Sequence, residues 1–89
     1  MKKSAKGKIL KRLKILEGQI RGVQKMVEKD VYCIDILHQA MAIKEGLFGV
    51  EDVILENHLV THAANQMRRG KSAKATKEIL SIYKLSRKR

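Results

Sequence analysis

The sequence lacks the features that stabilise most very small proteins. It has 89 residues and one cysteine, so no disulfide can form within the chain. It has no proline or tryptophan, and aromatic residues make up only 3% of it, which argues against a β-sandwich or barrel. A domain of this size buries only about 60–65% of the surface that its unfolded chain exposes. We therefore expect an all-α protein that is stabilised by oligomerisation, by a metal ion or by both.

Long hydrophobic runs are also missing, so the sequence predicts no membrane-spanning segment. The basic residues at the start of the chain are not followed by the apolar stretch that a signal peptide has, so no signal peptide is predicted. A cysteine without a partner favours a reducing compartment. We expect a cytoplasmic protein with a single domain over residues 1–89.

The net charge of +11 is divided into three blocks. Residues 1–29 and 68–89 are strongly basic, whereas residues 30–67 hold six acidic residues and a single basic one, Lys44. Two basic blocks around an acidic one indicate a polyanionic partner that contacts the ends of the chain. If the basic residues only kept the protein soluble, like charges would not need to be concentrated at this density. A membrane surface is disfavoured because the basic blocks carry no Trp or Phe anchors.

Apolar residues recur at helical spacing along the first basic block. They alternate in steps of four and three: Ile9, Leu13, Leu16, Ile20, Val23 and Val27. This heptad rhythm predicts a helix over residues 4–29, with Asp30 as the N-cap of the next helix. A short helix is predicted over residues 73–85, before a basic tail over residues 86–89.

Nothing in the sequence interrupts a helical pattern over residues 31–67, and such a helix would be about 55 Å long. It needs partners along its sides. Gly46 and Gly49 lie near its middle, where small residues allow another helix to cross closely or, alternatively, only weaken the helix. Gly70 is predicted to end it, and Ser72 to cap the helix that follows.

Cys33, His58 and His62 are candidate metal ligands. The two histidines are four positions apart, so their rings share one face of a helix. Cys33 and His58 are about 37 Å apart along a continuous helix and cannot share an ion within one chain. Two antiparallel chains related by a two-fold axis near residues 46–48 would bring Cys33 of one copy beside both histidines of the other. One thiolate and two imidazoles suit copper(I), zinc, nickel or cobalt.

Four stretches together resemble the CsoR/RcnR family of metal-sensing repressors. They are Leu10-Lys11-Arg12-Leu13, Glu17-Gly18-Gln19-Ile20-Arg21-Gly22-Val23, Asp30-Val31-Tyr32-Cys33-Ile34-Asp35-Ile36-Leu37, and Glu56-Asn57-His58 with His62. The resemblance covers nearly the whole chain. It implies three helices without a helix-turn-helix, assembled as antiparallel dimers into a tetramer. It also implies Cys33, His58 and His62 as the sensing triad, with Tyr32 and Glu78 hydrogen-bonded around His58.

The resemblance further implies the inducing metal and the response. Copper sensors usually have a second Cys at position 62, and nickel or cobalt sensors add an N-terminal His that this chain lacks. We expect copper(I) as the inducer, with nickel, cobalt or zinc as alternatives. The metal-free protein is expected to bind double-stranded operator DNA and to release it with metal. Arg12 is the first DNA-binding candidate, followed by Lys8, Lys11, Lys14 and Arg21.

Two other functions fit the same sequence features. A constitutive architectural nucleic-acid-binding protein would have the basic blocks but no effector. A metal chaperone would use them to dock an acidic protein and would not bind duplex DNA. An enzyme is not expected, because no nucleophile–base pair, phosphate-binding glycine loop or carboxylate pair accompanies the ligands. No small-molecule substrate is expected either.

Overall fold

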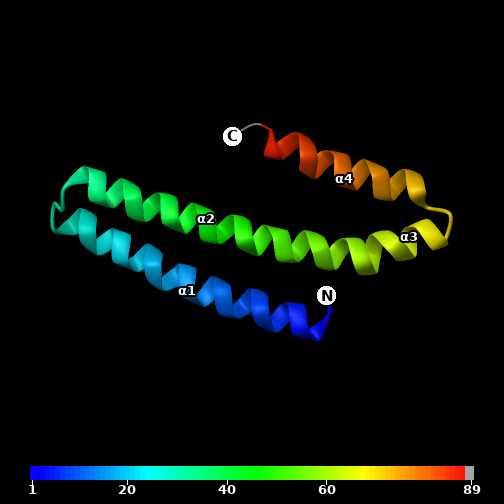
Figure 1. Cartoon of the computed structure of the whole chain (residues 1–89), viewed down its shortest axis with the longest axis horizontal. Helices are drawn as coiled ribbons and strands as arrows, with labels where there is room; N and C mark the ends of the chain where they lie inside the picture. Colours follow the sequence, from blue (N-terminus) through cyan, green and yellow to red (C-terminus); the bar gives the residue numbers. More distant parts are fainter. Residues whose placement is uncertain (88–89) are drawn as a thin grey trace. The chain divides into compact units, whose positions relative to one another are not determined.

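A computed structural model describes residues 1–87 of the chain, and over these residues the secondary structure is helical (Figure 1). The elements are α1 (Lys3–Glu28), α2 (Cys33–His58), a π-helical turn (Leu59–Ala63), α3 (Ala64–Arg68) and α4 (Ser72–Ser86). The backbone stays helical from α2 through the π turn into α3. The predicted all-α fold of two long helices and a short one is confirmed. Lys88 and Arg89, in the predicted basic tail, lie outside the described residues.

The long second helix differs from the prediction in one respect. Residues 31–67 were expected to form a regular α-helix, but the backbone makes a π turn at Leu59–Ala63, where the Ala64 N–H donates to the Leu59 carbonyl. π turns are rare and are frequently found at functional sites. The chain divides into two compact units, Met1–Leu55 and a unit that begins at Glu56.

In the first unit, α1 packs alongside α2 (Figure 1). The core consists of Ile9 and Leu16 from α1 and Val50 from α2, with Ile43 and Val53 packed against it. Ile9 and Leu16 are seven positions apart, so only one row of the predicted heptad seam faces α2. The other row, Leu13, Ile20 and Val27, remains exposed. Half of the apolar seam of α1 is therefore unpaired within this unit.

The close helix crossing predicted at Gly46 and Gly49 is formed by α1 of the same chain. A Cβ atom on Gly46 would lie 2.6 Å from Leu16 Cδ2, so only glycine permits this approach without displacing Leu16. At Gly49, the carbonyl oxygen accepts a hydrogen bond from Arg12 Nη1 at 3.3 Å. These glycines thus serve packing inside one chain and give no support to a crossing between two chains.

Asp30 ends α1 and does not cap α2, so its predicted role was wrong. Its φ is +53°, in the left-handed region. The Asp30 N–H donates to the Val27 carbonyl at 3.1 Å, and the Val31 N–H donates to the Met26 carbonyl at 3.0 Å. This pair of bonds is a Schellman motif, which satisfies carbonyls that the helix end would leave open. Helix α2 begins after Tyr32.

The same motif ends α3. Gly70 has a φ of +76°, and its N–H donates to the Met67 carbonyl at 3.2 Å. The Lys71 N–H donates to the Gln66 carbonyl at 2.7 Å. The predicted helix end at Gly70 is confirmed. Ser72, however, is the first residue of α4 and not its cap, because Lys71 occupies the N-cap position without a side-chain hydrogen bond.

The second unit contains the π turn, α3 and α4. The chain reverses after Gly70, and α4 turns back against α3 (Figure 1). Its buried residues are small: Ala63 is 2% exposed and Ala75 is fully buried. Asn57 is the buried polar residue at the start of this unit. Over residues 1–87, no helix is both long and apolar enough to cross a membrane.

Candidate metal centre

His58 and His62 form a close pair in the second unit. His58 is the last residue of α2, and His62 lies in the π turn. Their ring centroids are 5.6 Å apart, with an angle of 41° between the ring planes. With metal–nitrogen bonds of about 2.0–2.1 Å, two imidazoles on one ion have centroids no more than about 6 Å apart. The separation of the two rings is therefore within the range that a shared metal ion requires.

Both imidazoles are open to a further ligand from outside the chain. His58 is half-buried and His62 is exposed. Cys33, a free and exposed thiol, is the first residue of α2, whereas His58 is the last. Within the described part of the chain, no three His, Cys, Asp or Glu side chains come together to hold a metal. One chain thus presents a histidine pair and a separate thiol.

The two residues predicted to surround His58 lie in different surroundings. Tyr32 is 68% exposed and precedes α2 in the first unit. Glu78 lies on α4, where its Oε1 accepts a hydrogen bond from Gln66 Nε2 at 3.1 Å. Among residues 1–87, Glu78 forms no ion pair with a lysine, and the salt bridge there is that of Arg21 with Glu17.

Gln66 is a residue that sequence reasoning missed. It lies four positions after His62, which is the spacing that signals a shared helix face. Together with Thr61, His62 and Asn65 it lines an open pocket in the second unit. Its Oε1 is buried and accepts no hydrogen bond in the described structure. Nearby, the Thr61 hydroxyl donates to the Asn57 carbonyl at 2.6 Å across the start of the π turn.

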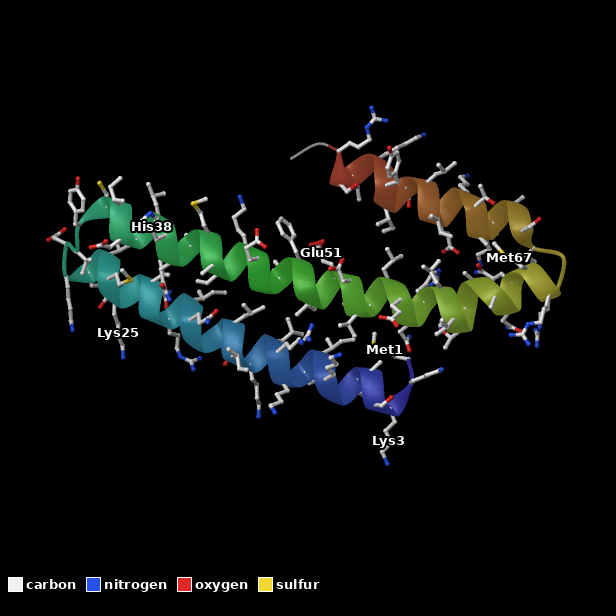
Figure 2. The ribbon with its side chains drawn as sticks, in the orientation of Figure 1. Met1, Lys3, Lys25, His38, Glu51 and Met67 are labelled. Atoms are coloured by element: carbon white, nitrogen blue, oxygen red, sulfur yellow. The ribbon has the colours of Figure 1, made fainter. Side chains whose placement is uncertain are left out.

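The predicted DNA-binding residues lie on α1. Lys8, Lys11 and Lys14 are exposed. Lys3 and Lys25 also point away from α2 (Figure 2). Two arginines are already engaged: Arg21 pairs with Glu17 at 2.9 Å, and Arg12 is half-buried through its bond to Gly49. The exposed surface of α1 therefore carries several lysines as well as the exposed apolar row, and Arg12 is held in place by α2.

The chain belongs to a family of transcriptional regulators. Residues 5–84 match the family described as metal-sensitive transcriptional repressor. This match confirms the predicted family and the prediction of a metal-responsive repressor that is not an enzyme. It also indicates a DNA-binding protein that oligomerises, as this family of repressors does.

Within this family the chain is similar to copper sensors. It is 42% identical over 79 residues to the copper-sensing transcriptional repressor CsoR of Bacillus subtilis, which covers 89% of this chain and 78% of that protein. It is 39% identical over 80 residues to the copper-sensing repressor RicR of Mycobacterium tuberculosis, covering 86% and 83%. The crystal structure of CsoR with Cu(I) from Geobacillus thermodenitrificans matches with a TM-score of 0.92 and 42% identity, over 99% of this chain and 92% of that one.

Proposed function

We propose that this protein is a copper(I)-responsive repressor that binds operator DNA when metal-free and releases it when Cu(I) binds. The observation that carries this proposal is the facing pair of His58 and His62, 5.6 Å apart, on a chain 42% identical to a Cu(I)-bound CsoR. A thiolate with two imidazoles is a donor set that suits Cu(I).

The proposed site forms between two copies of the chain. Cys33 of one copy would complete the coordination of His58 and His62 of an antiparallel partner. Two observations support this arrangement. Cys33 and His62 are exposed and His58 is half-buried. Cys33 and His58 also lie at opposite ends of α2. In the proposed site Tyr32 and Glu78 hydrogen-bond around the metal-bound His58, because outer residues orient ligand imidazoles.

The proposed DNA surface is α1, in a tetramer built from two such dimers. Lys8, Lys11, Lys14, Arg12 and Arg21 would contact phosphates. Such contacts supply most of the affinity and little of the sequence preference, so the operator would be recognised largely by its shape. Because linkage is reciprocal, a metal that weakens DNA binding is itself bound less tightly on DNA, with a coupling of about 1–3 kcal/mol.

The test is operator binding by fluorescence anisotropy with Cu(I), Ni(II), Co(II) and Zn(II) titrated separately. We expect Cu(I) to lower operator affinity at one equivalent per chain. Cys33→Ser should bind DNA normally and ignore Cu(I). His38→Ala is the matched control, because His38 is another exposed α2 residue outside the site, and it should respond like the wild type.

Each alternative gives a different titration. Release by Ni(II), Co(II) or Zn(II) but not Cu(I) would keep the repressor and change its metal. An operator affinity that no metal alters, with Cys33→Ser equal to the wild type, would contradict the sensor and indicate an architectural DNA-binding protein.

A further inference from the structure

The Gln66 side chain lines the same pocket as His62, one of the proposed Cu(I) ligands. A histidine that binds metal through one ring nitrogen almost always donates its other N–H to an oxygen acceptor, which fixes the orientation of the ring. Gln66 Oε1 is a buried acceptor without a partner in the described structure, in a pocket that His62 also lines. Buried polar atoms are rarely left unpaired, so an orphan acceptor at this position calls for a donor.

The other end of the same amide is already committed. Gln66 Nε2 donates to Glu78 Oε1 at 3.1 Å, which ties α3 to α4. This bond also fixes which end of the amide faces Glu78, because a carboxylate accepts only from the NH₂ group. Oε1 is then the end of the amide that remains available to another donor.

We propose that Gln66 is a positioning residue that links His62 to Glu78, with Oε1 accepting the ring N–H of His62 and Nε2 holding the carboxylate. This inference rests on the proposed Cu(I) site. It gives the metal a direct path from the π turn to α4, which carries Lys74, Lys77 and Lys84. It also depends on a histidine at position 62, because a cysteine ligand has no ring N–H to donate.

The test is a double-mutant cycle on Cu(I) affinity, measured by competition with a chromophoric Cu(I) chelator on the full chain. Gln66→Met keeps the length of the side chain and removes both polar atoms. We expect it to weaken Cu(I) binding by about 10–100-fold, the usual effect of losing an outer-shell partner. In a His62→Cys background, the same substitution should leave Cu(I) affinity unchanged. An equal loss in both backgrounds, or no loss in the native one, would overturn the proposal.

A second variant separates the two ends of the amide. Gln66→Glu keeps an acceptor for His62 but cannot donate to Glu78. We expect it to retain Cu(I) affinity while the Cu(I)-induced release of operator DNA becomes weaker. Loss of Cu(I) affinity equal to that of Gln66→Met would contradict the role of Oε1. Asn65→Ala, in the same pocket, is the control and should match the wild type in both measurements.

These outcomes are distinct from failure of the proposed function. If the wild-type protein does not bind Cu(I), or keeps its operator affinity when it does, the copper repressor itself is contradicted. If wild-type release is normal and Gln66→Met responds identically, only the role of Gln66 is overturned. The metal-free operator affinity of each variant shows that it has folded and assembled.

Discussion

At the residue scale, Gly46 is a point of close approach between α1 and α2. A Cβ at this position would lie 2.6 Å from Leu16 Cδ2, and Leu16 is 7% exposed in the core with Ile9 and Val50. We expect Gly46→Ala to destabilise the protein by about 1–3 kcal/mol, because the core must shift to admit the methyl group. Urea unfolding followed by circular dichroism measures this change.

Gly22→Ala is the matched control for that substitution. Gly22 is also in the interior of a helix, but its Cβ would meet no atom within 4 Å. Removal of a helix glycine should then stabilise the protein by about 0.5–1 kcal/mol. If the two alanine variants unfold at the same urea concentration, the close packing at Gly46 does not contribute to stability.

Arg12 combines a structural bond with its proposed contact to DNA. Its Nη1 donates to the Gly49 carbonyl, which leaves the remaining guanidinium donors for phosphate. We expect Arg12→Ala to weaken operator binding and to reduce the slope of log affinity against log salt by about 0.9 for each phosphate that the side chain neutralises. Arg12→Lys should keep most of that slope because it keeps the charge. The measurement is anisotropy over a series of salt concentrations.

Lys44 provides the control for Arg12. It is an exposed basic residue in the acidic middle of the chain, on α2. Lys44→Ala should leave the salt dependence unchanged. A salt slope that falls equally in Arg12→Ala and Lys44→Ala would show that overall charge, and not a surface on α1, determines the binding.

At the element scale, spacing predicted the helices well and their ends less well. The apolar rhythm from Ile9 to Val27 placed α1 within one residue at each end, because burial against α2 follows that periodicity. Asp30 was misplaced because Asp serves both as an N-cap and, less often, in the left-handed position that ends a helix. The π turn left no pattern in the sequence, since it changes the hydrogen-bond register without changing which residues are apolar.

Asp30 and Gly70 end their helices with the same geometry, so substitutions at these two positions allow a paired prediction. Gly70 and Asp30 both have positive φ, at +76° and +53°. A left-handed conformation costs a residue with a Cβ about 1–2 kcal/mol, and no atom lies within 4 Å of a Cβ at Gly70. Gly70→Ala should therefore destabilise the protein by about 1 kcal/mol, whereas Asp30→Gly should stabilise it slightly.

Thermal unfolding of the two variants at equal protein concentration measures both changes. Because neither substitution alters a side-chain contact of the core, a change of the same sign in both would contradict the conformational explanation.

At the scale of the whole molecule, a single chain leaves much of its apolar surface uncovered. Large hydrophobic residues remain exposed on α1, α2 and α4; those on α2 include Ile34, Leu37, Met41, Leu47 and Ile54. The sequence predicted this need for partners from its length, and it also predicted that Cys33 and His58, two of the proposed ligands, lie far apart along one helix. It could not predict the acceptor on Gln66, whose importance depends on which side chains the π turn and α4 bring together.

A site shared between two chains makes a prediction that a site within one chain does not. Cys33→Ser and the double variant His58→Ala/His62→Ala should each fail to bind Cu(I). In an antiparallel dimer formed from one copy of each, one site has none of the three ligands and the other has the native thiol and both native imidazoles. Random mixing of equal amounts makes half of the dimers mixed, so the mixture should bind about a quarter of the wild-type amount of Cu(I).

The mixture must be unfolded and refolded together so that the copies exchange. Equilibrium dialysis against a buffered Cu(I) concentration then gives the bound metal per chain. The control is the same mixture prepared without unfolding, which should bind no Cu(I) until subunits exchange. A refolded mixture that binds no Cu(I) would contradict the shared site. Its mixed dimers contain the native thiol on one copy and both native imidazoles on the other, so they should bind Cu(I) if these ligands meet between copies. Recovery to a quarter requires ligands from two chains, since neither variant alone retains the full set.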